Sequence, residues 1–365
     1  MKSGQLKRGW GSLFALFLLG SLGTASAEPY LAVQKGMQCS ACHSHPAGGG
    51  KRNAYGNVYA QMELPVMRIG DGDLWTGEIT KWLAVGGNLR GGLEMIDTPN
   101  REDTSEFRVN RGTLYAEATL IPGFLSVYID QQFSPDASQN REAYVRLNGK
   151  NGKLFAAAGQ FYLPYGLRLQ DDTAYVRLAS AINFTNPDRG IQVGYEAGPW
   201  STIVSLTNGS GGGRETDSGK QISVVSNFVQ ARWRFGVSAN NNNADAGDRT
   251  MFGLFAGLRT GPIAWLAEID RISDDLSPAV TQDALAGLLE GNWSIRKGHN
   301  LKLSHEYLDP DDDLSEDHQV RNSLVWEYTP MQFFQTRIGL RMYDGVPQVD
   351  TQNRDVFFAE IHGFF

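Results

Sequence analysis

The sequence is poor in the residues and patterns from which most enzyme centres are built. It has 2 cysteines and 6 histidines among 365 residues. No serine-triad, Walker or Rossmann pattern is recognisable, so the hydrolase and nucleotide-binding classes receive no support. The formal net charge is −7 and no basic stripe is present, which argues against nucleic acid as a partner. After residue 27, no stretch approaches the roughly 18 uncharged apolar residues of a spanning helix, so no transmembrane helix is expected.

Residues 1–27 have the three parts of a secretory signal peptide. A basic start, MKSGQLKR, precedes the apolar stretch LFALFLLGSL, and Ala25-Ser26-Ala27 forms a small-residue cleavage site. The apolar stretch is too short to cross a bilayer as a helix. We therefore expect the signal peptide to be removed and the mature protein to be exported.

Both cysteines lie in one short motif, Cys39-Ser40-Ala41-Cys42-His43. This spacing attaches haem covalently in c-type cytochromes, where the thiols form thioethers and the histidine is the first axial ligand of the iron. A disulfide between the cysteines is the alternative in an oxidising compartment, and the histidine that follows them favours haem. We expect one covalent haem c, attached through Cys39 and Cys42, with His43 bound to the iron.

The second axial ligand of the iron is not evident from the sequence. The distal candidates are Met62, Met67, His362 and His45. A methionine would raise the haem potential, and a second histidine would lower it relative to methionine. His45 follows His43 by two residues, so a surface or propionate contact is its other interpretation. His362 would otherwise line a barrel lumen, and Met37 lies too close before Cys39 to reach round easily.

The rest of the chain has the pattern of a β protein. Apolar and polar residues alternate with period 2 between turns rich in glycine, asparagine and aspartate, and glycine accounts for 42 residues. In LSVYIDQ, for example, Leu125, Val127 and Ile129 alternate with polar residues. Sixteen strands are predicted, near 83–97, 105–121, 123–134, 141–149, 152–162, 188–198, 199–208, 219–233, 234–243, 249–260, 262–272, 281–295, 298–309, 318–329, 331–343 and 354–365.

The connections between these strands alternate between short and long. Tight turns such as IPG (121–123) and AGP (197–199) alternate with polar loops such as TPNREDTS, SDDLSPA and DPDDDLSED. Short periplasmic turns, longer external loops and an even strand number are typical of outer-membrane barrels, and the terminal Phe365 resembles their assembly signal. A secreted β-sandwich or soluble solenoid is the alternative. We predict a transmembrane antiparallel β-barrel of about 16 strands in the lipid of the bacterial outer membrane, with both termini periplasmic.

We therefore predict three parts of the chain: a signal peptide (1–27), a monohaem cytochrome c-like head (28–75) and a porin-like barrel (76–365). Small chains bury little surface, so the head cannot enclose a haem alone. We expect it to dock into the periplasmic mouth of the barrel. The segment 162–185 is too long for a plain turn, and it either folds inward as a constriction or forms a surface flap. Its charged residues are Arg168, Asp171, Asp172 and Arg177.

The plan of leader, single CxxCH motif and sixteen-stranded barrel resembles the fused monohaem cytochrome–porins, outer-membrane proteins best known from aerobic iron-oxidising bacteria. That family carries a stretch of the form A-x-P-x-F-A-R-Q-T just before its haem motif. Here AEPYLAVQK matches at Ala27, Pro29, Ala32 and Gln34, and departs at Leu31, Val33 and Lys35. The resemblance implies an electron path from an extracellular donor, through the haem, to periplasmic carriers.

Two functions compete. In the first, an extracellular donor such as ferrous iron gives one electron to the haem, and a periplasmic cytochrome or other electron carrier removes it, which would be an Fe(II):cytochrome oxidoreductase activity. Acidic loops such as 309–317 would attract cations or are ordinary solvated loops. The second function is a diffusion porin for small solutes with an accessory cytochrome head. The sequence leaves open the direction of electron flow and the oligomeric state.

Overall fold

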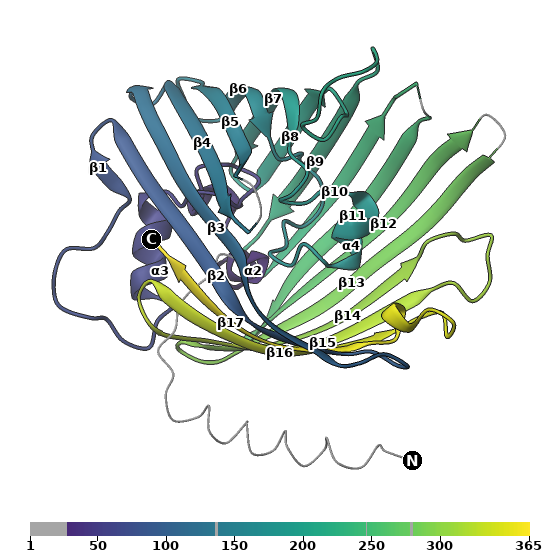
Figure 1. Cartoon of the computed structure of the whole chain (residues 1–365). Helices are drawn as coiled ribbons and strands as arrows, with labels where there is room; N and C mark the ends of the chain where they lie inside the picture. Colours follow the sequence, from purple (N-terminus) through teal and green to yellow (C-terminus); the bar gives the residue numbers. More distant parts are fainter. Residues whose placement is uncertain (1–27, 136–137, 246, 278–279) are drawn as a thin grey trace.

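A computed structural model of the chain describes residues 28–135, 138–245, 247–277 and 280–365. The predicted signal peptide, 1–27, lies outside these residues. Within them, sixteen antiparallel strands form one closed barrel (Figure 1). The barrel strands are β2 (Leu83–Asp97), β3 (Thr104–Ile121), β4 (Leu125–Ser134), β5 (Gln139–Asn148), β6 (Leu154–Phe161), β7 (Asp188–Ala197), β8 (Trp200–Thr207), β9 (Gln221–Val229), β10 (Trp233–Asn242), β11 (Arg249–Thr260), β12 (Ile263–Ser277), β13 (Val280–Arg296), β14 (His299–Asp309), β15 (Gln319–Met331), β16 (Phe334–Asp344) and β17 (Asp355–Phe364).

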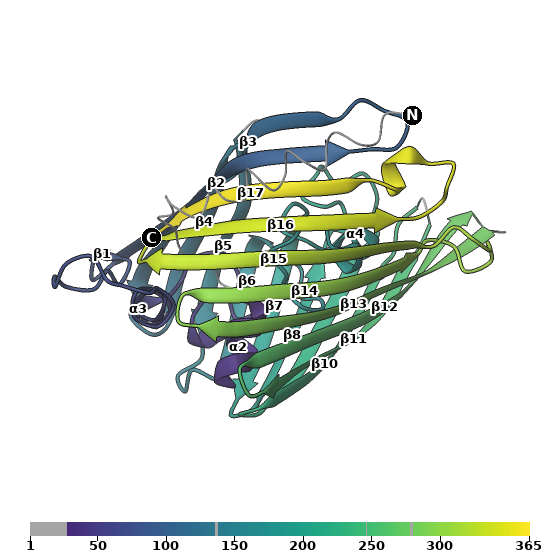
Figure 2. The same cartoon turned by 90° about the horizontal axis from the view of Figure 1, so that it is seen from below.

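The ring closes through the first and last of these strands. Each strand pairs with its neighbour in sequence, and β17 pairs with β2, where Phe357 lies opposite Met95. Closure therefore pairs both edges of every strand of the described ring. A three-residue strand, β1 (Glu78–Thr80), pairs with the start of β2 and lies at one end of the barrel (Figure 2). The predicted barrel of sixteen strands is confirmed.

Side chains alternate between the lumen and the outer surface of the barrel. On β4, Ser126, Tyr128 and Asp130 are buried in the interior, whereas Ile129 between them is 45% exposed. On β16, Gln335 is buried as well. In a water-soluble protein this distribution would cost free energy, because apolar surface would face solvent and polar groups would be buried. In a membrane barrel the outer apolar band faces lipid.

Six exposed aromatic side chains lie at the end of the barrel that carries the short turns. They are Trp82, Phe124, Trp200, Trp233, Trp265 and Trp293. Each lies at or near the end of a strand beside a short connection. Aromatic side chains with one polar edge favour the boundary between lipid and water. The short-turn end therefore has the girdle of an outer-membrane barrel.

One connection differs from the prediction. The sequence pattern predicts a polar loop at SDDLSPA, but β12 continues to Ser277 and β13 begins at Val280. Asp274 pairs with Gln282 and Asp275 with Thr281 across this extension. The hairpin continues past the apolar band, where both faces of a strand meet water. Polar residues can therefore occupy both faces there, which removes the alternation that marks a strand.

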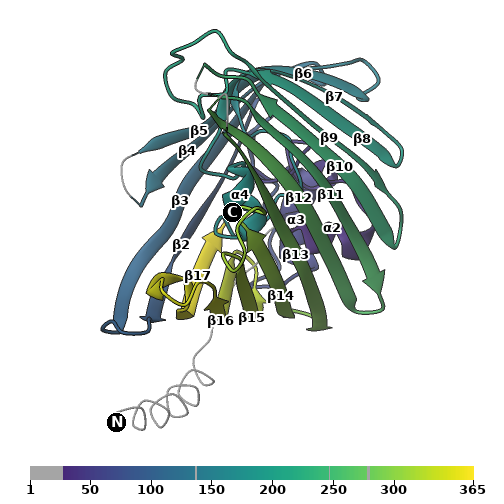
Figure 3. The same ribbon diagram turned by 90° about the vertical axis from the view of Figure 1, so that its right-hand side faces the viewer.

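Two segments of the chain occupy the lumen (Figure 3). The head contributes the helices α2 (Pro29–Lys35), η3 (Cys39–Ala41) and α3 (Ala54–Met62). The connection 162–187 folds inward and carries α4 (Tyr175–Ser180), which contacts β12, β13 and β14. The inward constriction, rather than the surface flap, is thus what the chain forms. In the described part of the chain, no helix is long and apolar enough to cross a membrane.

Candidate functional site

The CxxCH motif forms a tight turn between two short helices of the head. Pro29 begins α2, where its fixed φ suits the first helical position, and Gly36 ends it in the left-handed conformation. The η3 turn follows at once, and the His43 amide donates to the Cys39 carbonyl at 3.1 Å. This turn therefore holds both cysteines and the histidine close together in space.

Asn53 joins this turn to α3. Its side-chain oxygen accepts from the Gly56 amide at 2.9 Å and caps the helix. Its side-chain nitrogen donates to the Ser40 and Ala41 carbonyls at 3.0 and 3.1 Å. A Cβ added at Gly56 would lie 2.1 Å from the Cys42 carbonyl oxygen, so only glycine allows this close approach. The helix α3 therefore supports the CxxCH motif directly.

Polar contacts with the wall hold the head in the short-turn end of the lumen. Lys51 Nζ lies 3.1 Å from the Glu117 carboxylate, and Glu28 lies 3.3 Å from Lys302 Nζ. The Gln38 side chain donates to a carbonyl in the turn between β7 and β8 at 2.8 Å. The side chains of Lys51, Glu28 and Lys302 are nearly fully buried. The head thus lies inside the mouth of the barrel, as the sequence predicts.

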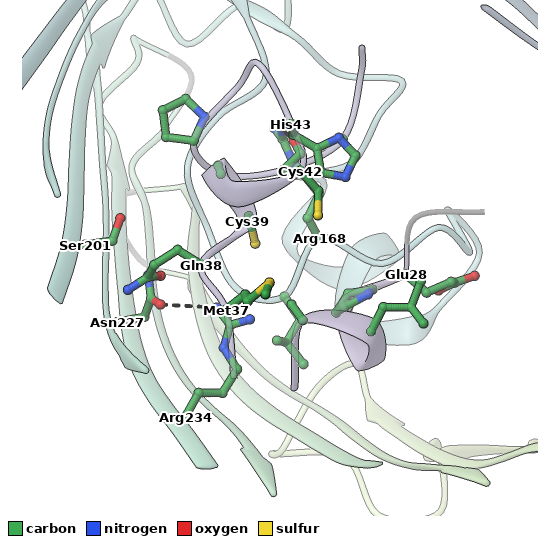
Figure 4. Close-up of a pocket in the computed structure, with 18 of the residues that line it drawn as sticks. Glu28, Met37, Gln38, Cys39, Cys42, His43, Arg168, Ser201, Asn227 and Arg234 are labelled. Atoms are coloured by element: carbon green, nitrogen blue, oxygen red, sulfur yellow. Dashed lines mark hydrogen bonds between the residues drawn. The ribbon is translucent and has the colours of Figure 1, made fainter. Parts of the chain in front are cut away.

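A cavity with about 1150 Å³ of empty space, partly open to solvent, separates the head from the wall. Cys39, Cys42 and His43 line it from the head (Figure 4). The strands of the wall contribute three apolar side chains, Ile203, Val225 and Phe255. The inward segment contributes Leu163, Leu167 and Arg168. A concave, largely apolar space with a few polar groups is the usual form of a cofactor site.

The two cysteines are free thiols in the structure, so the alternative of a disulfide is not formed. Both are half-buried and line the same cavity. Burial raises the pKa of the Cys42 thiol, and the nearby Arg52 guanidinium partly opposes that shift. Two free thiols that open on one cavity fit the attachment of a haem through two thioethers.

The His43 side chain is 8% exposed, and its Nδ1 has no hydrogen-bond partner among the described residues. Burial lowers the pKa of His43 to about 3; the Arg52 guanidinium acts in the same direction, and backbone groups of Gly49 and Gly50 oppose it. The neutral imidazole is the form that binds a metal. An unpaired ring nitrogen at the edge of the cavity therefore fits a ligand of haem iron.

The predicted distal ligands lie elsewhere. None of Met62, Met67, His362 and His45 is among the described residues that line this cavity. Met62 and Met67 are 37% and 53% exposed. The Nδ1 of His45 accepts from the Ala47 amide at 3.1 Å, and its ring packs edge-on against Tyr144. His362 is buried on β17 and lines a second cavity.

Two residues that sequence reasoning did not assign to the site line it. Met37 lies on the cavity although it precedes Cys39 by only two residues, because the chain turns between Gly36 and η3 (Figure 4). Arg234 of β10 lines the cavity from the wall, and its Nη2 donates to Asn227 at 3.2 Å. No local pattern marks Arg234, since only closure of the barrel brings β10 opposite the head.

Three of the four charged residues predicted for the inward segment form ion pairs with the wall. Asp171 lies 2.8 Å from Arg341 Nη2 and 3.1 Å from Arg321 Nη2. Asp172 contacts Arg111, and Arg177 contacts Glu268. Arg168 donates to the Gly48 carbonyl at 2.7 Å and so contacts the head rather than a carboxylate. These contacts attach the constriction to the wall on one side and to the head on the other.

Solved outer-membrane proteins share this barrel. An anion-selective porin from Comamonas acidovorans matches with a TM-score of 0.63 and 9% identity, over 78% of this chain and 99% of the porin. Pseudomonas putida OprB gives a TM-score of 0.62 and 10% identity, over 78% and 94%. The trimer form of Vibrio cholerae OmpT gives 0.58 and 13% identity, over 78% and 99%. No protein-family model matches the chain, and no curated protein matches its sequence.

These observations define the class of the molecule. The chain is a closed antiparallel barrel of sixteen strands with the fold of the outer-membrane porins. At such low identities the likeness concerns the fold alone. The fold itself does not require the two free thiols and the buried imidazole within the lumen. The function of the chain must therefore be inferred from these residues.

Proposed function

We propose that the chain is an outer-membrane monohaem c-type cytochrome–porin that passes electrons between an extracellular donor and periplasmic electron carriers. The observation that carries this proposal is the convergence of Cys39, Cys42 and the buried His43 on one largely apolar cavity inside the barrel. The head is too small to surround a haem, and the wall supplies the missing side of the cavity.

Each residue of the site then has a distinct task. Cys39 and Cys42 would attach the haem, and His43 would bind its iron. When bound, a haem c supplies a one-electron redox centre. The apolar wall side chains would exclude water, and Arg168 and Arg234 would offset the negative charge of the haem propionates. Met37 is the distal-ligand candidate that lines the cavity.

The proposed location is the bacterial outer membrane, with the short-turn end and both termini in the periplasm. The exposed apolar face and the aromatic girdle support a membrane barrel. The head would then lie within reach of a periplasmic cytochrome or other carrier, while the long loops would meet the extracellular donor. Ferrous iron is the donor to test first, and with it the protein would act as an Fe(II):cytochrome oxidoreductase.

The proposal is tested on the full chain, matured by a cytochrome c assembly system and purified in detergent. Fe(II) is added without oxygen while the visible spectrum is followed, with dithionite as the control reductant. A reduced c-type band with Fe(II) supports an iron-oxidising conduit. A band with dithionite alone retains the cytochrome and removes iron as the donor. A protein without any haem spectrum contradicts the proposal.

A diffusion porin with an accessory head is the second candidate, and the comparisons favour it. The matched structures include proteins described as porins, one of them anion-selective. Conductance of the haem-loaded full chain in planar bilayers separates the two candidates. The conduit predicts a nearly closed lumen, because the head and the inward segment both fill it. Stable open channels in the haem-loaded protein would favour the porin.

The oligomeric state of the chain is a separate part of the proposal. The trimer form of Vibrio cholerae OmpT is among the matched structures. We infer that the exposed outer face allows association with further copies within the membrane. Light scattering of the detergent-solubilised full chain gives its mass, and a monomer at all protein concentrations would contradict this inference.

A further inference from the structure

A second cavity adjoins the first inside the barrel. It has about 690 Å³ of empty space and shares His43, Gly49, Arg52 and Arg168 with the first cavity. Its remaining lining comes from the strands β2 to β5, from β17 and from the inward segment 162–187. The second cavity therefore lies between the head and the constriction.

The lining of this second cavity is strongly cationic. Among the described residues that line it, five are arginines and one is a carboxylate. The arginines are Arg52, Arg90, Arg111, Arg141 and Arg168, and the carboxylate is Asp130. Three more carboxylates lie beside it: Asp172 contacts Arg111, Glu142 accepts from the Tyr162 amide at 3.1 Å, and Glu360 interacts electrostatically with Arg90. Positive charges thus outnumber negative charges among the described residues around this space.

Two of these arginines face each other across the sheet. Arg90 of β2 is the direct cross-strand partner of Arg111 of β3, and both line the cavity. Like charges directly opposite one another destabilise a sheet. The register then shifts, because Gly91 pairs with Val109 and Asn110 is the extra residue of a bulge. A bulge re-aims the side chains beside it, and bulges are frequent next to functional sites.

A second bulge points a further arginine into the same space. Glu142 pairs with Asp130 and Asn140 pairs with Gln131, so Arg141 is the extra residue of β5. As a result, Arg141 and Glu142 are both buried, at 5% and 0% exposed, although strict alternation would put one of them outside.

The polar atoms of Arg141 are incompletely paired. Its Nε and Nη2 donate to Gln132 Oε1 at 3.0 and 2.7 Å. Its buried Nη1 has no hydrogen-bond partner among the described residues. A buried guanidinium without a carboxylate partner is costly unless an anion compensates its charge. Asp130 and Asp172 act on Arg141 from a distance, but among the described residues no carboxylate lies within ion-pair distance of its guanidinium.

We propose that this cavity binds an oxyanion, held by Arg141 together with the facing pair Arg90 and Arg111. Guanidinium groups bind phosphate and carboxylate oxygens through paired, charge-assisted hydrogen bonds. Two sources supply this chemistry: a small free oxyanion such as phosphate, or a propionate of a haem bound in the adjoining cavity. The site does not depend on electron transfer and would serve a conduit or a porin equally.

The test measures binding of radiolabelled inorganic phosphate to the full chain in detergent by equilibrium dialysis. One preparation is made without cytochrome maturation and carries no haem, and the other is haem-loaded. The test variant is Arg141→Gln. The matched control is Arg249→Gln, which removes the same charge from a partly buried arginine that contacts Asp274 and lies outside the cavity. Heat-dependent migration on gels establishes that each variant forms the barrel.

We expect saturable binding to the haem-free chain, with affinity about tenfold or more weaker in Arg141→Gln and changed about twofold or less in Arg249→Gln. Binding in both preparations identifies a free oxyanion as the occupant. Binding in the haem-free preparation alone identifies the propionate, and Arg141→Gln then shifts the haem potential. No saturable binding without haem, or equal losses in the two variants, overturns the proposal. A missing haem spectrum would contradict the proposed function without affecting this result.

Discussion

The two segments that fill the lumen differ in what they present to the space inside the barrel. The inward segment, 162–187, buries Leu167 and Val176 against the wall, and its Arg177 contacts Glu268. The head, 28–75, is held by ion pairs such as Lys51 with Glu117 and by Tyr30 and Val33 in the apolar core, yet a cavity that is partly open to solvent lies between it and the wall. The inward segment therefore has close apolar and charged contacts with the wall, whereas the head carries Cys39, Cys42 and His43 on the border of a cavity.

This difference separates a structural insert from a binding insert. Wall residues supply the apolar neighbours and the counter-charges of the inward segment, so changes at these contacts should cost stability. The head carries two thiols and an imidazole on the border of the cavity, so changes there should cost ligand binding before they cost stability. Variants in each segment test whether the two inserts really divide the tasks in this way.

The largest expected effect is the loss of covalent haem on changing the cysteines of the head. The double variant Cys39→Ala with Cys42→Ala removes both thioether positions and should abolish haem staining after denaturing electrophoresis. His45→Ala is the control, because His45 is buried beside Tyr144 and lies outside the cavity. It should retain the stain. A haem-stained double variant would refute covalent attachment at this motif.

The next effect is a loss of stability in the inward segment. The Arg177 and Glu268 side chains are 3% and 0% exposed, so Arg177→Ala leaves an uncompensated buried carboxylate. We expect the free energy of unfolding to fall by about 3–5 kcal/mol, measured by denaturant titration of tryptophan fluorescence in detergent. Arg271→Ala breaks a solvent-exposed contact with Asp283 and should change little. Equal midpoints for the two variants would contradict a structural role of the segment.

A smaller effect is expected where the head meets the wall. Lys51 is 3% exposed and lies 3.1 Å from Glu117, so Lys51→Met should weaken docking of the head by about 1–3 kcal/mol. Limited proteolysis should then cut the head faster while the barrel stays intact. Lys35→Met is the matched control, since Lys35 and Glu63 form a pair in which both side chains are well exposed. If both variants are cut at the wild-type rate, the ion pair does not hold the head.

The smallest effect is expected in the external acidic loop, which belongs to neither insert. Asp311 and Asp313 lie in the connection between β14 and β15, where solvent and salt screen their charges. We expect the variant Asp311→Asn with Asp313→Asn to change the rate of haem reduction by Fe(II) by about twofold or less at roughly 0.15 M salt. A tenfold loss would show that the loop gathers the cation, and a functional part of the molecule would then lie outside the lumen.

Much of the barrel was predictable because its pattern is local. Period-2 alternation, turn residues and alternating connection lengths placed the sixteen strands within a few residues of their bounds. The extension of β12 through Asp274 and Asp275 was missed, because strands beyond the apolar band lose the alternation. The bulges at Asn110 and Arg141 could not be predicted either, since no residue pattern there indicates an extra residue in a strand.

The candidate site likewise has one part that could be predicted from local sequence and one part that could not. Cys39, Cys42 and His43 are recognised from their spacing, because their chemistry needs them within one turn of chain. The cavity residues Phe255 and Arg234 are far from them in sequence and reach the head only when the ring closes. Met37 was set aside on sequence distance, although the turn at Gly36 brings it to the cavity.

The sequence by itself determined that the chain forms a large β-barrel with a polar interior and that it carries one CxxCH motif. Both properties depend on residues that are close in sequence: the barrel on the alternation of side chains along each strand, and the motif on the short spacing of its residues. Only the tertiary structure decided which wall residues face the head across a cavity, and that arginines from separate strands surround the adjoining space. These features depend on which strands lie opposite one another in the closed ring. They also depend on how the head and the inward segment pack inside the lumen.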